Sequence, residues 1–334
     1  MKAAFRFAVV LLGLLAGAPA LAAPGEVVVY SSRNEHLIKP LFERFTADTG
    51  IKVRYVTDKE GPLMQRLRAE GANTPADVLL TVDAGNLWAA SEMGLLQATD
   101  SEVLENNVPA HLRDPENRWF GLSVRARTIV YNREKVDPAA LSGYAALAEP
   151  EWRGRLCLRT SKKVYNQSLV AMLLAEHGEA RTEEIVRGWV RNLAAPPFAS
   201  DNEVLSAIAA GQCDVGIVNT YYLGRMLRAT PELPVTVFWP DQDGSGVHVN
   251  VSGAGVTKHA PNPELGRRLI EWLSSAEAQE MFAGLNLEYP ANPEVPADPL
   301  IAAWGEFKPN VINVSNAGRL QAKAVMLMDR SGYR

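Results

Sequence analysis

The fold class is decided by the segment Glu26-Val27-Val28-Val29-Tyr30-Ser31-Ser32, a β-branched run that ends in small polar residues. Such a run predicts a buried parallel strand. Apolar residues at helical spacing follow it as far as Gly50, and they predict a helix with a glycine stop. Residues 51–56 and 76–82 predict two further strands, separated by a short helix over 62–70. This β-α-β-α-β order predicts a parallel sheet covered by helices on both faces.

A second α/β unit is expected after Gly121, beginning with a crossing strand over 124–131 and ending with a return strand over 247–256. Between them we expect strands at 154–158 and 214–218, and helices at 166–176, 183–193 and 204–210. Two doubly wound α/β lobes joined by crossing strands leave a cleft between them. Clefts of this kind are common ligand sites.

The N-terminus has the pattern of a cleavable signal peptide over residues 1–22. Lys2 and Arg6 precede an apolar run from Phe7 to Leu15, and small residues then lead to Ala20-Leu21-Ala22. The apolar run is shorter than the roughly 20 residues that a membrane helix needs. No cysteine follows the expected cleavage site. We therefore expect an exported, soluble protein without a lipid anchor.

The composition is that of a globular protein, with 334 residues of which 47% are hydrophobic and 22% charged. This length suggests about two domains. The formal net charge is −4, and loss of the two basic residues of the signal peptide makes it about −6. An acidic protein is a poor candidate for nucleic-acid binding, which depends on basic side chains that meet phosphates.

Cys157 and Cys213 are the two thiols of the chain. In an exported protein an even number of cysteines predicts a disulfide, which would stabilise a loop of this length by ~4 kcal/mol in the chain-entropy model. Their spacing excludes a CxxC redox motif, and two thiols alone make a weak metal site.

The sequence lacks the usual motifs of catalysis. It has no GxSxG elbow, P-loop or GxGxxG fingerprint, and none of its five histidines pairs with another at zinc-motif spacing. These histidines are His36, His111, His177, His248 and His259. Without a credible pair of nucleophile and base, we do not expect an enzyme.

An unusual feature is Asn219-Thr220-Tyr221-Tyr222, which follows a predicted buried strand. The carboxyl end of a strand is where open α/β sheets bind ligands. A bare tyrosine pair is most often packing or a stacking platform. A phenolate is also a hard anionic donor suited to a trivalent cation, and a metal can deprotonate a phenol whose free pKa is about 10. The residues alone leave both interpretations open.

Six motifs together resemble the periplasmic ferric ion-binding proteins of ABC-type iron uptake over essentially the whole mature chain. They are Val29-Tyr30-Ser31-Ser32-Arg33, residues 70–83 (EGANTPADVLLTVD), Arg125-Ala126-Arg127, Val164-Tyr165-Asn166-Gln167-Ser168, Asn219-Thr220-Tyr221-Tyr222 and Val251-Ser252-Gly253-Ala254-Gly255-Val256. The resemblance implies a bilobal periplasmic-binding-protein fold of type II. It places residues 23–123 and 248–299 in an N-terminal lobe, and residues 124–247 and 300–334 in a C-terminal lobe.

By this resemblance Tyr165, Tyr221 and Tyr222 supply phenolates to Fe(III), and a synergistic anion, carbonate or another, completes the site. The chain has Asn34-Glu35 where many members have histidine or histidine-tyrosine, and Val82 where some have a glutamate. These departures point to the subgroup that uses three tyrosines. Glu35 is a candidate fourth ligand, although a solvated carboxylate at a helix start is the favoured interpretation. His36 is assigned to the surface.

Basic side chains near the cleft are candidates for holding the anion. For Arg33 and Arg125 we favour contact with the anion, and the alternative for each is a structural salt bridge. On an extended strand the side chains of Arg127 and Arg125 point to the same face, so Arg127 is a competing candidate for the anion contact. Ser161 and Lys162 are weaker candidates, in a predicted loop before Tyr165.

The resemblance implies a monomeric periplasmic protein that captures Fe(III) and delivers it to an inner-membrane ABC permease with its cytoplasmic ATPase. An alternative is the same fold with an organic or oxyanion solute such as a polyamine, thiamine or a phosphonate. In that case the tyrosines would stack on the solute and the arginines would clamp its anionic group.

Overall fold

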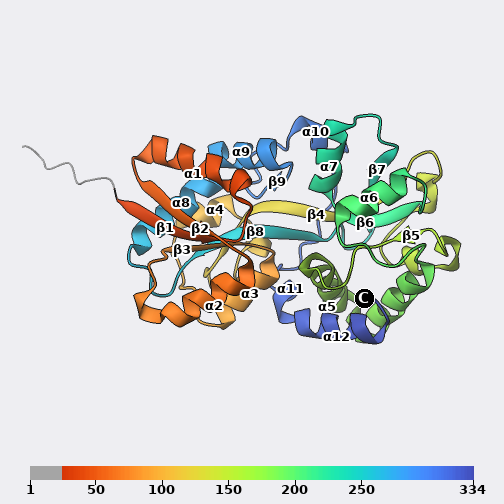
Figure 1. Ribbon diagram of the computed structural model, residues 1–334, viewed down its shortest axis with the longest axis horizontal. Coiled ribbons are helices and arrows are strands. Elements are labelled where there is room, and N and C mark those ends of the chain that lie inside the picture. The colour runs from red at the N-terminus through yellow and green to blue at the C-terminus, as the bar shows by residue number, and fades with distance from the viewer. Residues whose placement is uncertain (1–24) are drawn as a thin grey trace, which may run out of the picture.

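The computed structural model describes residues 25–334, so the predicted signal peptide lies outside the described residues. Figure 1 shows an elongated molecule in which the long strands β4 (Phe120–Asn132) and β8 (Val249–Val256) run from one half to the other. The protein has the predicted α/β architecture, a bilobal fold of type II. Within residues 25–334 no helix combines the length and the apolar character needed to cross a membrane.

The predicted β-α-β-α-β opening is confirmed. Strand β1 (Glu26–Ser31) lies between the parallel strands β2 (Lys52–Thr57) and β3 (Val78–Val82). Helix α1 (Glu35–Thr49) buries Ile38, Leu41, Phe42 and Phe45, and it ends at Gly50 with a φ of 71°. Glycine adopts this left-handed conformation without the steric cost that a Cβ brings. Helix α2 (Glu60–Glu70) then leads to β3.

The rest of this half consists of helices that follow β3 and of a later segment of the chain that follows β8. Helices α3 (Ala84–Glu92) and α4 (Glu102–Asn107) follow β3, and α8 (Pro263–Ser274) and α9 (Ala276–Asn286) follow β8. Ser275 caps α9 by accepting a hydrogen bond from the backbone N–H of Ala278. The short strand β9 (Tyr289–Pro290) then pairs with β4.

The other half begins where β4 changes its partners. Up to Ala126 this strand pairs with β8, and from Arg127 onward it pairs with β6 (Val215–Asn219) and β7 (Val235–Phe238). Because β8 runs antiparallel to both β3 and β4, the sheet is mixed rather than purely parallel. The lobe boundaries inferred from the sequence stay a prediction.

Helices cover this second half, and a disulfide crosslinks it. The helices are α5 (Val164–Asn192), α6 (Asp201–Ala209), α7 (Thr220–Ala229), α10 (Pro299–Ala302), α11 (Asn316–Arg319) and α12 (Gln321–Arg330). Gly178 has a φ of 74° and interrupts α5, which matches the two helices expected there. The predicted disulfide is present: Cys157 of β5 (Leu156–Cys157) is bonded to Cys213 just before β6.

Candidate metal centre

Three tyrosines lie in the first turns of two helices of the second half. Tyr165 is in the first turn of α5, and Tyr221 and Tyr222 are in the first turn of α7, directly after the buried strand β6. Tyr165 and Tyr221 are buried, and Tyr222 is half-buried. The ring centroids of Tyr221 and Tyr222 are 4.4 Å apart. The fold therefore gathers phenols at helix starts, where backbone N–H groups favour negative charge.

The phenol of Tyr221 lies close to that of Tyr165. Burial raises the pKa of Tyr221 well above its ordinary value, and the neighbouring phenols of Tyr165 and Tyr222 raise it further, while Arg125 lowers it. A hydrogen bond with Tyr165 also contributes to the raised pKa, and the Asn219 amide donates to the Tyr221 hydroxyl at 3.3 Å. In the free protein Tyr221 is therefore a protonated phenol, and a cation that binds it must displace the proton.

Four cationic side chains stack on the tyrosine rings. The guanidinium carbons of Arg125 and Arg159 lie 5.5 and 5.7 Å from the Tyr165 ring centroid. The Lys163 ammonium lies 4.7 Å from the same centroid, and the Arg225 guanidinium carbon lies 4.9 Å from the centroid of Tyr221. Positive charge at these positions stabilises phenolates as they form.

Sequence reasoning missed three of these cations: Arg159, Lys163 and Arg225. Helical spacing was an available signal for Arg225, which is four residues after Tyr221 and therefore lies on the same helix face. The sequence gives no comparable signal for Arg159, because its approach to Tyr165 depends on how the segment before α5 packs.

Arg125 faces the tyrosines from β4 with part of its hydrogen-bonding capacity unused. Its Nη2 donates to the hydroxyl of Ser252, while its buried Nε has no hydrogen-bond partner among residues 25–334. Burial lowers the pKa of Arg125, but Glu288, the two tyrosines and Asp83 outweigh this effect and raise it. Arg125 therefore keeps its charge, and its Nε–H, which has no acceptor in the described part of the chain, is a donor suited to an anion.

Arg127 is bound differently. Its Nη1 lies 3.1 Å from Asp201 Oδ2 and 3.1 Å from Asn219 Oδ1, and its Nε lies 3.0 Å from Asn166 Oδ1. Asn166 follows Tyr165, and Asn219 precedes α7. The Nε, Nη1 and Nη2 of Arg127 thus all have protein acceptors, two of which belong to residues beside the helix starts.

Arg33 is paired with a residue far along the chain. Its Nη2 lies 3.0 Å from Glu288 Oε2, and the two side chains are only 2% and 5% exposed. Its Nη1 donates to Ser123 Oγ at 3.3 Å. The salt-bridge role weighed from the sequence is therefore present, and it involves Glu288, a carboxylate that sequence reasoning did not find.

Ser161 and Glu35 are the two remaining candidates of the predicted site. Ser161 lines a cavity of about 480 Å³ together with residues of α12 and the C-terminal Arg334. Glu35 is exposed at the start of α1 and accepts a hydrogen bond from the Tyr55 hydroxyl at 2.9 Å. Over residues 25–334 no hydrogen bond joins either side chain to the three tyrosines. His36 is exposed, as expected.

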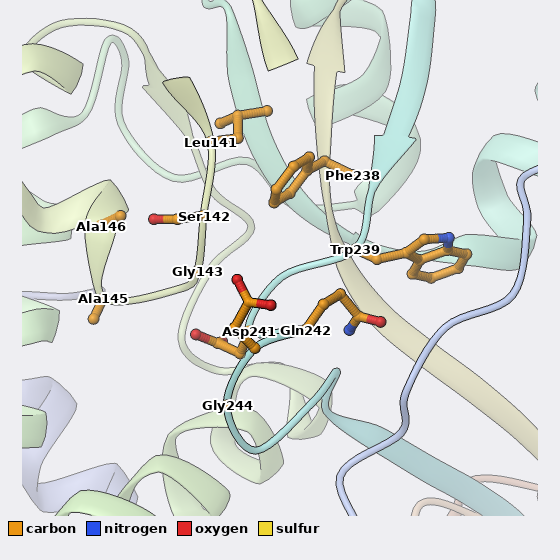
Figure 2. A pocket seen from close by; sticks show the side chains of 11 residues that line it. Leu141, Ser142, Gly143, Ala145, Ala146, Phe238, Trp239, Asp241, Gln242 and Gly244 are labelled. Atoms are coloured by element: carbon orange, nitrogen blue, oxygen red, sulfur yellow. The ribbon is translucent and has the colours of Figure 1, made fainter. Parts of the chain in front are cut away.

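The described part of the chain contains no group of three or more His, Cys, Asp or Glu side chains that could hold a metal ion. Figure 2 shows another cavity of about 480 Å³, between the segments 141–146 and 238–244, where the Asp241 carboxylate approaches Gly143. None of the candidate site residues lines that cavity.

The fold and the cluster of buried phenols and arginines define a bilobal solute-binding protein. The chain belongs to the family of bacterial extracellular solute-binding proteins, whose sequence profile matches residues 40–309.

Similar proteins include iron uptake protein A1 of Synechocystis (strain PCC 6803), which is 44% identical over 95% of this chain and 91% of its own. A Trichodesmium structure solved in complex with iron and citrate ligands has a TM-score of 0.90 and 46% identity, covering 93% of this chain and 100% of that chain. The open ferric iron-binding protein A of Mannheimia haemolytica has a TM-score of 0.86 and 37% identity, covering 92% of this chain and 99% of that chain.

Proposed function

We propose that this protein captures Fe(III) through the phenolates of Tyr165, Tyr221 and Tyr222. The observation that carries the proposal is that the phenols of Tyr165 and Tyr221 approach each other beside Arg125, with Tyr222 stacked on Tyr221. Hard anionic oxygen suits a hard trivalent ion, and three phenolates balance its charge. The printed names of its relatives, which include iron uptake and ferric iron-binding proteins, support the same cargo.

A synergistic anion, carbonate or another, is the second part of the proposal. Arg125 is its main contact because the Nε of this arginine is buried and unpartnered among the described residues. Arg33 and Ser161 are the further contacts proposed from the sequence, and Glu35 is the proposed additional iron ligand. Arg33 is already paired, because its Nη2 lies 3.0 Å from Glu288 Oε2, and its contact with the anion is proposed from the sequence alone.

The proposed setting follows from the family. We expect a monomeric binding protein of the periplasm, not an enzyme, with the lobes divided at residues 123/124, 247/248 and 299/300. Its partner would be an inner-membrane ABC permease with a cytoplasmic ATPase. Membership of the extracellular solute-binding family supports this assignment.

The test is a titration of iron-free protein with ferric citrate. A visible phenolate-to-iron absorption band should appear in the wild type and in Tyr131→Phe, which removes a half-buried phenol elsewhere in the same half of the molecule. The band should be lost in Tyr221→Phe/Tyr222→Phe. Absence of the band in the wild type, or its persistence in the double variant, would refute the site.

Calorimetry separates the organic or oxyanion alternative. A polyamine, thiamine and a phosphonate are each titrated into metal-free protein. Heat of binding from any of them without iron, together with no visible band on iron addition, would favour that alternative over Fe(III).

A further inference from the structure

Glu288 is a buried carboxylate that the iron chemistry above does not use. It lies between α9 and β9 and is 4% exposed. The residue before it, Leu287, has a φ of 55° and packs in one cluster with Tyr221 and Ile301. The backbone carbonyl of Asn286 accepts from Arg225 at 3.3 Å. The segment 286–288 therefore packs against α7, the helix that contains Tyr221 and Tyr222.

The carboxylate of Glu288 acts on both candidate anion-binding arginines. It forms the 3.0 Å ion pair with Arg33. Of the charges that raise the pKa of Arg125, that of Glu288 has the largest effect. Burial alone would raise the pKa of Glu288, but Arg33 and Arg125 lower it, so the group is ionised. Removal of either partner would leave the other charge buried and unpaired, which is costly.

We propose that Glu288 is a positioning residue that sets the anion dependence of the iron site. Its carboxylate neutralises Arg33 from within the protein and leaves Arg125 to hold an added anion. This inference rests on the proposed function, because it assumes that Fe(III) binds to the tyrosines.

The charge balance separates an effect on the anion from an effect on iron. Exchange of three phenol protons for one Fe(III) leaves the charge of the site unchanged, so a new charge nearby alters this step little. An added anion does change the charge of the site. Removal of Glu288 therefore strengthens anion binding. After removal of Arg33, the negative charge of Glu288 acts on Arg125 alone, and anion binding is weakened.

The experiment uses the iron-loaded mature protein, moved into carbonate-free buffer and titrated with bicarbonate while the visible band is followed. The half-saturating bicarbonate concentration should fall about tenfold in Glu288→Gln and rise about tenfold in Arg33→Gln, the size of one hydrogen bond to a charged group. The double variant Arg33→Gln/Glu288→Gln restores the net charge and should titrate close to the wild type. Glu294→Gln, which removes an exposed carboxylate six residues further along the chain, is the matched control and should also titrate close to the wild type.

Equal bicarbonate dependence in the wild type, Glu288→Gln and Arg33→Gln would overturn the proposal. A structural ion pair without this role predicts that outcome, with only the thermal unfolding midpoints changed. If Glu288→Gln does not fold, the comparison of Arg33→Gln with the double variant decides, because only the former retains the unbalanced carboxylate. Absence of the band in the wild type would instead refute the proposed iron site.

Discussion

Arg125 and Arg127 lie two residues apart on β4 and are equally buried, at 2% and 1% exposure, yet their surroundings differ. Arg125 lies where β4 pairs with β8, and its Nη2 donates to the neutral Ser252 while its Nε has no partner within residues 25–334. Arg127 lies where β4 pairs with β6, and its guanidinium is bound by Asp201, Asn166 and Asn219. We therefore expect Arg127 to act mainly on the structure of the site, and we propose Arg125 as the arginine that holds a ligand.

The largest effect on stability is expected from Arg127→Gln. It leaves the Asp201 carboxylate, which is fully buried, facing fewer charged donors. Loss of one partner from a buried pair costs roughly 3–5 kcal/mol of unfolding free energy. Chemical denaturation measures the loss, and Arg127→Gln/Asp201→Asn should recover part of it because neither charge then remains unpaired. A variant as stable as the wild type would mean that Arg127 does not organise the helix starts.

Arg125→Gln should affect anion binding strongly and stability only slightly, the opposite of what is expected for Arg127→Gln. We expect its affinity for bicarbonate to fall about 10- to 100-fold, because a charged donor beside the phenols is lost. The unfolding free energy should change by only about 1–2 kcal/mol. Band titration and denaturation of the same sample check both values. If Arg125→Gln instead destabilised the fold as much as Arg127→Gln, the distinction between the two arginines would fail.

The pattern of these contacts explains what the sequence could and could not predict. Strands β1 to β3 and their helices follow from local periodicity, and Gly50 supplies its own stop signal. The three tyrosines came from the resemblance, because a tyrosine pair alone fits packing equally well. Glu288 was missed because its partner Arg33 lies 255 positions away, a separation at which no periodic pattern operates. Likewise, Arg125 and Arg127 share one facing in the sequence, and only tertiary packing distinguishes them.

Iron affinity should depend on pH through the phenol of Tyr221. Burial raises the pKa of Tyr221, so the free protein keeps this proton across the neutral range and Fe(III) must displace it. Each displaced proton makes the apparent affinity rise about tenfold per pH unit, and the gain is lost as the pH falls. Competition with a chelator of known pH dependence measures the slope. A pH-independent affinity would show that Tyr221 gives up no proton to the metal.

The smallest effect is expected from Glu35→Gln. This variant adds an exposed charged side chain to the comparison of the two buried arginines. Glu35 lies in water at the start of α1, and its carboxylate accepts from the Tyr55 hydroxyl at 2.9 Å. An exposed carboxylate is already solvated, so removal of its charge should change iron affinity only a few-fold and stability by less than about 1 kcal/mol. Tyr55→Phe removes the same hydrogen bond and keeps the carboxylate. If Glu35→Gln weakened iron binding strongly while Tyr55→Phe did not, Glu35 would be the fourth iron ligand, and the first half of the molecule would supply a donor as well as charge.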